Sequence, residues 1–70
     1  MKEYKSENGV VVTIQGDELT CVSKGGLNLT LSNITVNYID DVRFIAKNEM
    51  YEFYTVVENG VLKHFYIGEL

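Results

Sequence analysis

The side chains that could carry out chemistry are few and lie far apart in the chain. There is one histidine, His64, and one cysteine, Cys21. General acid–base or nucleophilic catalysis needs a second polar group within hydrogen-bond reach of the first. Nothing in the spacing places a carboxylate or a nucleophile beside His64, and a lone histidine is more often a partly buried or rim side chain. The sequence therefore predicts that this chain is not an enzyme.

The cysteine and the acidic residues offer no better basis for a redox or metal site. Cys21 stands in an apolar run with no base beside it, which is typical of a small core residue rather than a reactive thiol. Asp40 and Asp41 would point to opposite faces of a strand, and no third ligand is spaced to join them. Gly25 and Gly26 form too short a run for a phosphate-binding loop. We therefore expect no metal and no cofactor.

Length and charge limit the class of partner. The 70 residues allow one domain, residues 1–70, whose thin core would gain from association with a second copy. The net charge is −4, and the six lysines and arginines are dispersed. Nucleic-acid binders cluster such residues on one face, so no nucleic-acid partner is expected. An acidic surface of this kind could instead approach a basic protein.

The same composition bears on location and source. No apolar run approaches the length of a membrane span, and the polar N-terminal residues do not resemble a signal peptide. We therefore expect no membrane partner and a cytoplasmic location. A chain rich in asparagine, isoleucine, tyrosine and lysine, with no proline or tryptophan, suggests a small bacterial or phage protein.

The elements that must position these residues are predicted to be β-strands. Glycines and asparagines separate short alternating runs of β-branched and aromatic residues, which is the pattern of consecutive hairpins. Residues opposite each other in antiparallel strands share a face, so a correct turn sets apolar residues opposite apolar ones. A two-residue turn at 16–17 pairs Ile14 with Leu19. A three-residue connection at 24–26, with a glycine at positive φ, pairs Leu31 with Leu19.

The middle of the chain is less regular. A two-residue turn at 32–33 would pair Leu31 with Ile34 and complete a first sheet of four strands. Aspartates are poor strand formers, so a bend is expected at residues 40–41. Residues 38–47 could form a short helix, but the alternation around Phe44 favours a strand.

Two further turns define the C-terminal strands. A turn at 48–49 pairs Phe44 with Phe53, and the Asn-Gly turn at 59–60 pairs Phe53 with Tyr66. The predicted fold is an all-β antiparallel meander of about seven short strands. It would form two packed sheets of four and three strands, or a small partly open barrel.

The outer face of the C-terminal strands departs from the expected pattern. This face should be exposed to solvent, but in the predicted register it carries apolar and aromatic residues beside an arginine. Such a composition is typical of an interaction surface. The residues expected to bind a partner are Arg43, Tyr54, Phe65 and Ile67. Alternatively, residues 2–6 would fold over this face and the side chain of Tyr4 would cover its apolar residues. The last strand, residues 61–67, would be an open edge able to accept another strand.

These features favour a non-enzymatic protein-interaction module that self-associates through the outer face of the C-terminal three strands. Two other functions fit the same sequence. A small acidic inhibitor, of phage origin, would bind a basic site on a host protein. A small-ligand-binding protein would hold its ligand at the sheet junction or between protomers.

Overall fold

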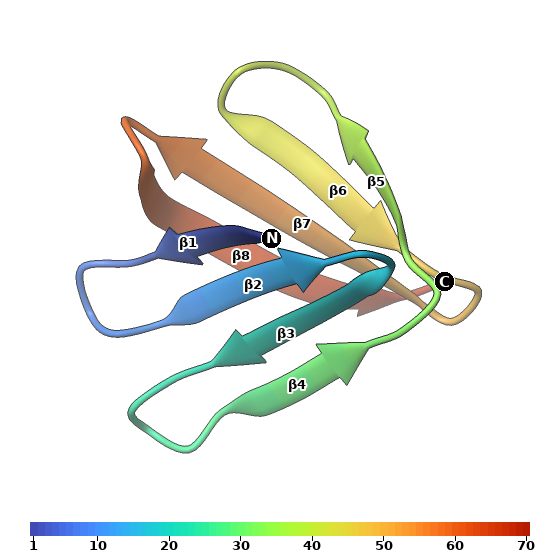
Figure 1. Cartoon of the computed structure of the whole chain (residues 1–70), viewed down its shortest axis with the longest axis horizontal. Coiled ribbons are helices and arrows are strands. Elements are labelled where there is room, and N and C mark those ends of the chain that lie inside the picture. The colour runs from blue at the N-terminus through green and yellow to red at the C-terminus, as the bar shows by residue number, and fades with distance from the viewer.

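Alternating runs of β-branched and aromatic residues, separated by glycine and asparagine, fold into strands and turns without any helix. The computed structural model describes all residues from 1 to 70 (Figure 1). The predicted all-β class is confirmed. The strands are β1 (Lys2–Lys5), β2 (Val11–Gln15), β3 (Glu18–Val22), β4 (Asn28–Leu31), β5 (Thr35–Tyr38), β6 (Arg43–Lys47), β7 (Tyr51–Glu58) and β8 (Val61–Glu69).

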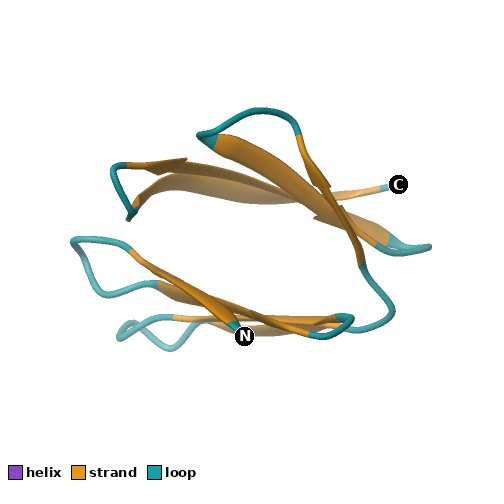
Figure 2. Cartoon of the chain, turned by 45° about the horizontal axis from the view of Figure 1, so that its top comes forward, coloured by secondary structure: helices purple, strands orange, loops and turns teal.

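All eight strands belong to one mixed sheet, in the order β4-β3-β2-β1-β8-β7-β6-β5. Neighbours are antiparallel except β1 and β8, which are parallel. The sheet is not closed, because β4 and β5 are its two edges. It curves so that the half containing β1–β4 faces the half containing β5–β8 (Figure 2). The prediction of two separate sheets of four and three strands is therefore wrong, although the alternative of an open barrel shares a single unclosed sheet with the structure.

The strand that joins the two halves was not predicted. Residues 2–5 read Lys-Glu-Tyr-Lys and lack an apolar run, yet they form β1, which pairs with β2 and contacts β8. Tyr4 faces the inner side of the sheet, where its ring lies 5.3 Å from the ring of Phe44 in the opposite half. The N-terminal residues therefore do not cover the outer face of the C-terminal strands.

The predicted registers of the first three long strands are confirmed. Ile14 lies opposite Leu19 in β2–β3, and Leu19 lies opposite Leu31 in β3–β4. Gly26 has φ = +101°, as the three-residue connection requires. Leu19 and Cys21 are completely buried, so this half of the sheet presents a continuous apolar surface to the core.

The predicted pairing of β4 with β5 is wrong. Asn33 does take a positive φ of 58°, but the chain after it crosses to the other half of the sheet, where β5 pairs with β6. The backbone N–H of Ile34 donates to the carbonyl of Asp17 at 2.9 Å, in the β2–β3 turn. This bond and the burial of the Ile34 side chain fix the crossing. Residues 43–47 are a strand, as predicted. The bend at residues 40–41 was expected to lead from the first sheet to the second, which is wrong, because it is a turn between β5 and β6 within the C-terminal half.

The β6–β7 hairpin has the predicted faces but a different register. Phe44 lies opposite Thr55, and Ala46 lies opposite Phe53, two residues away from the prediction. The side-chain oxygen of Asn48 accepts hydrogen bonds from the backbone N–H groups of Met50 and Tyr51, both at 2.8 Å, and this makes the loop longer than two residues. Because the shift is an even number of residues, Phe44 and Phe53 remain on the inner face.

A β-bulge changes the faces of β8. The Asn59-Gly60 turn forms and Val57 pairs with Leu62 as predicted, but the next pair is Val56 with His64. Lys63 is left without a partner on β7, so every later residue of β8 faces the side opposite to the predicted one. Phe53 therefore pairs with Ile67 rather than with Tyr66, and that prediction is wrong.

The core lies between the two halves of the sheet. Eleven buried apolar residues form one cluster, to which both halves contribute. The largest completely buried side chain is Phe53. Thr55, between Phe44 and Phe65 in the register, is also completely buried, and its hydroxyl has no hydrogen-bond partner.

Candidate functional site

The outer face of the C-terminal half carries a row of aligned side chains. Across β5, β6, β7 and β8 the register sets Asn37, Ile45, Tyr54 and Tyr66 side by side. The ring centroids of Tyr54 and Tyr66 are 5.3 Å apart, within the range of a favourable aromatic contact. Ile45 and Tyr54 are half-buried and Tyr66 is 55% exposed. We call Ile45, Tyr54 and Tyr66 the tyrosine row.

The flanking rows make this face mixed rather than uniformly apolar. On one side lie Arg43, Val56 and His64, and on the other lie Lys47, Glu52 and Gly68. An apolar and aromatic centre with charged and polar residues around it is the composition of a protein-binding surface.

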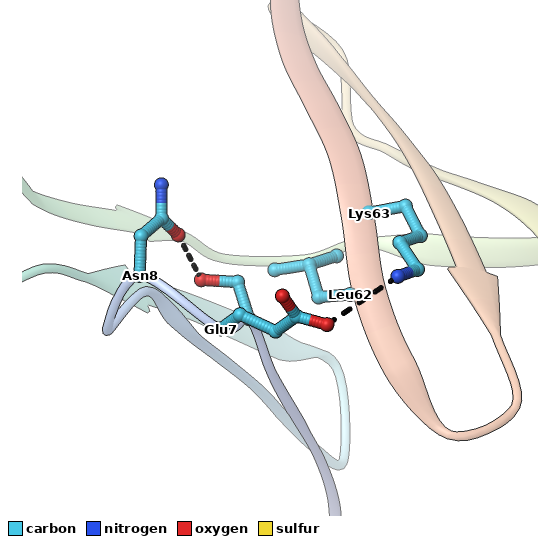
Figure 3. Close-up of a pocket in the computed structure, with 5 residues that line it drawn as sticks. Glu7, Asn8, Leu62 and Lys63 are labelled. Atoms are coloured by element: carbon cyan, nitrogen blue, oxygen red, sulfur yellow. Dashed lines mark hydrogen bonds and ion pairs between the residues drawn. The ribbon is translucent and has the colours of Figure 1, made fainter.

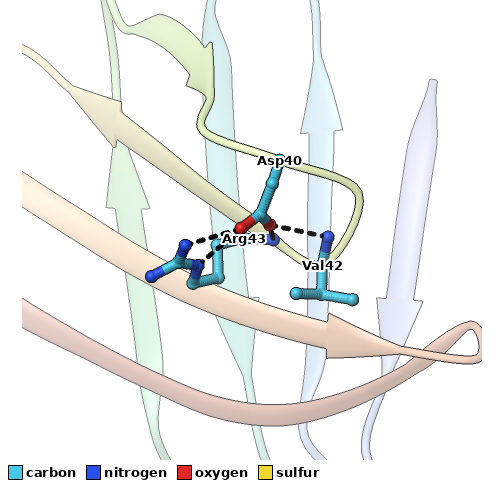
Figure 4. Close-up of polar contacts among 3 residues, drawn as sticks. All are labelled: Asp40, Val42 and Arg43. Atoms are coloured by element: carbon cyan, nitrogen blue, oxygen red, sulfur yellow. Dashed lines mark hydrogen bonds and ion pairs between the residues drawn. The ribbon is translucent and has the colours of Figure 1, made fainter.

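The position of Arg43 is fixed by the turn before it (Figure 4). One carboxylate oxygen of Asp40 accepts the backbone N–H groups of Val42 and Arg43, both at 2.9 Å. The other accepts Nε and Nη2 of Arg43, at 2.9 and 2.6 Å. These bonds, of which the one from the Arg43 side chain has the largest effect, hold the pKa of Asp40 below its usual value. The pKa of Arg43 is raised, mainly by its bond to Asp40 and to a smaller extent by Tyr54. The guanidinium is therefore already ordered beside Tyr54, which lowers the entropic cost of using it in a contact.

The four residues expected to bind a partner do not share one face. Arg43 and Tyr54 lie on the outer face, as predicted. The predicted outer position of Phe65 and Ile67 is wrong, because the bulge at Lys63 turns both inward. Phe65 stacks on Phe53, with ring centroids 5.6 Å apart and an interplanar angle of 12°.

Tyr66 takes the outer place that was expected for Phe65. The sequence gives no local sign of the exchange, since Phe65 and Tyr66 are both large aromatic residues and either could face the core. A bulge inserts one residue without changing the turn signal at Asn59-Gly60, so the turn alone could not reveal it.

The last strand was predicted to be an open edge of the sheet, which is wrong, since β1 lies beyond it. The ladder that joins them is short, however. It contains a single pair, Lys5 with Val61, and β8 then continues to Glu69.

The point where β1 and β8 separate is marked by a surface hollow of about 340 Å³ (Figure 3). The β1–β2 loop contributes Ser6, Glu7 and Asn8, and β8 contributes Leu62 and Lys63. The Lys63 ammonium lies 3.6 Å from the Glu7 carboxylate, and the Ser6 hydroxyl donates to the Asn8 side chain. Leu62 is the one apolar residue of the lining, so the hollow offers little apolar surface to a ligand.

The structure also places the residues that were considered for chemistry. His64 is exposed on the outer face opposite Val56. No group of three or more histidine, cysteine or acidic side chains is close enough to hold a metal ion. Cys21 is completely buried, and this burial raises the pKa of its thiol.

We expect Cys21 to react with Ellman's reagent only when the chain unfolds. The unfolded fraction of a small domain is on the order of 10⁻³ or less, so the native thiol should react at least about 10³-fold more slowly than in denaturant. Absorbance at 412 nm gives both rates, and Thr30→Cys supplies an exposed thiol as the control. A native Cys21 rate within about tenfold of that control would contradict the buried position.

These observations define an all-β chain with one unclosed sheet and an aromatic outer surface on its C-terminal half. No protein-family model, curated protein or solved structure matches the chain. None of its elements is a helix of the length and hydropathy needed to cross a membrane.

Proposed function

We propose that the chain is a protein-interaction module without catalytic activity, and that it self-associates through the outer face of β6–β8. The observation that carries this proposal is the tyrosine row, in which Ile45, Tyr54 and Tyr66 are aligned in register on a solvent-facing surface. Tyrosine and arginine are enriched among residues that dominate binding energy, and Arg43 stands next to this row.

The two halves of the sheet support the proposal by their contrast. The corresponding row on the outer face of the N-terminal half is formed by Glu3, Thr13, Thr20 and Thr30, all of them polar. The outer face of the N-terminal half does carry Val11 opposite Val22, but it has no aromatic residue, so the tyrosine row is specific to one half. An apolar patch rimmed by charges on a small chain is typical of a contact surface.

The charges of the proposed face allow a second copy as the partner. The chain carries −4 overall, which opposes association of two copies. The proposed face is close to neutral, because Arg43 is paired with Asp40, and Lys47 lies opposite Glu52. Two such faces can meet without strong repulsion, and their contact would bury apolar surface in addition to the thin core of a small domain. The proposal places the protein in the cytoplasm, where a free thiol such as Cys21 remains reduced.

Tyr54→Lys tests the face directly. It puts a charge at the centre of the row, and we expect the dissociation constant of the self-complex to rise at least about 30-fold, the effect of a central contact residue. Sedimentation velocity over a range of concentrations measures this constant. Thr30→Lys, on the polar outer row, is the matched control and should change it by less than about threefold.

Circular dichroism and urea unfolding would verify that both variants keep the fold. Tyr66→Lys provides a second substitution in the same row. Unchanged association of both tyrosine variants, with the parent chain associating, would show that the outer face is not the contact.

A further inference from the structure

β8 has a long edge that no strand of the chain covers. Its ladder with β1 contains only the pair Lys5–Val61, whereas its ladder with β7 continues to the pair Tyr51–Glu69. From Lys63 onward, β8 therefore has a neighbouring strand on one side only. The unpaired N–H and C=O groups of such an edge are a template for another strand.

The side chains of this edge are those that a further strand would cover. Ile67 faces the inner side opposite the completely buried Phe53, yet it is 41% exposed. Phe65, on the same side, is only partly buried although it packs against the core. The inner side of β8 is thus apolar but incompletely covered, in contrast to β7, whose Phe53 and Thr55 have no exposed surface.

We infer that two copies of the chain join β8 to β8 as an antiparallel pair, with Tyr66 opposite its counterpart in the second copy. The inference rests on the proposed function, since it takes self-association as given. It assigns a second contact, at the edge of the sheet, which shares Tyr66 with the outer face.

The symmetry of such a pair restricts its register. Two identical antiparallel strands are related by a two-fold axis perpendicular to the sheet, so each residue must lie opposite one from the same face. With Tyr66 at the axis, Phe65 lies opposite Ile67 on the inner side, and Lys63 lies opposite Glu69 at both ends. Apolar residues meet apolar ones, and opposite charges meet twice.

The neighbouring registers lack this complementarity. With Phe65 at the axis, Lys63 lies opposite Ile67, and with Ile67 at the axis, Glu69 lies opposite Phe65. Each sets a charge against an apolar residue in two symmetry-related places, which is unfavourable for a cross-strand pair. The register centred on Tyr66 is therefore the one that the sequence of β8 favours.

This arrangement would also extend the tyrosine row. Tyr66 is the end of the row on β8, and its counterpart would continue the row into the second copy. The joined sheet would present one uninterrupted aromatic strip that crosses the two-fold axis, which leaves the outer face of the pair free to meet that of another pair.

Engineered disulfides test the register. Opposite residues in an antiparallel pair have Cα atoms about 4.5–5.5 Å apart, a distance that a disulfide spans. We would mix the Lys63→Cys chain with the Glu69→Cys chain under mild oxidation and follow linkage by non-reducing electrophoresis and intact mass. The expected result is a disulfide-linked heterodimer, in a yield at least about tenfold higher than that of the linked homodimer of either variant. A Lys63→Cys and Ser32→Cys mixture is the control.

The outcomes distinguish the edge contact from the proposed function. If the parent chain associates but the mixture links no more than the control, the edge register is wrong and the proposed self-association stands. If the parent chain is monomeric at every concentration, both the proposed function and this inference fail. Linkage that persists when Tyr54→Lys is present in both chains would support the edge contact and count against the outer face.

Discussion

Replacement of Phe53 by alanine is expected to lower the free energy of unfolding by about 3–5 kcal/mol. Phe53 is the largest completely buried side chain, lies between Ala46 and Ile67 in the sheet, and stacks on Phe65. Its removal leaves a cavity at the centre of the cluster that joins both halves. A domain of this length has about 4–10 kcal/mol of stability in all, so the variant would be close to unfolding.

Urea unfolding followed by circular dichroism measures this loss. Tyr66→Ala, on the outer face of the neighbouring strand, is the matched control, and we expect it to cost no more than about 1.5 kcal/mol. Should Phe53→Ala not fold, Phe53→Leu offers a smaller truncation that leaves less cavity. A larger loss for Tyr66→Ala than for either Phe53 variant would mean that the faces of β7 and β8 are reversed.

Replacement of Thr55 by valine is expected to have the opposite sign, and to raise the free energy of unfolding by about 1–2 kcal/mol. The Thr55 side chain is completely buried, and its hydroxyl oxygen has no hydrogen-bond partner. Valine has nearly the same shape, so it would remove the cost of burying that hydroxyl without opening a cavity. It also suits a strand equally well, because both residues are β-branched.

The same unfolding assay applies, with Thr30→Val as the control. Thr30 is exposed on the outer face of β4, so this change should stay within about 0.5 kcal/mol. A destabilising effect of Thr55→Val, at unchanged Thr30→Val, would show that the Thr55 hydroxyl makes a favourable interaction in solution.

The sequence predicted registers well where a turn and an apolar alternation agree. In β2–β3 and β3–β4 both signals point to the same pairs, such as Leu19 with Leu31, and the structure has them. In β6–β7 the turn residue Asn48 accepts two backbone N–H groups and makes a longer loop than the two-residue pattern suggests. The inner and outer faces were still predicted correctly, because the register differs by an even number of residues.

The larger differences come from interactions between residues distant in sequence. The strand β1 has no apolar pattern of its own and is held by β2 on one side and by the contact of Tyr4 with Phe44 across the core. The separation of β4 from β5 is accompanied by a backbone hydrogen bond from Ile34 to Asp17. Neither could be recognised from the local sequence, so the division into sheets was predicted incorrectly.

The candidate site shows the same limit. Arg43 and Tyr54 lie on a strand pair whose faces were predicted correctly, and they share the outer surface. Phe65 and Ile67 lie beyond the bulge at Lys63, where one unpaired residue exchanges inner and outer positions. The patch was predicted on the correct half of the sheet, the C-terminal one, but the residue that β8 contributes to it is Tyr66.

The parallel pairing of β1 with β8 has a consequence for how the chain folds. The other ladders join strands adjacent in sequence, so each can form from a local hairpin on a timescale of about 1–10 μs. Pairing Lys5 with Val61 instead requires closure of nearly the whole chain, a step with a large entropic cost. The hairpins of each half can thus form early, and the union of the halves through β1, which completes their shared core, would come last.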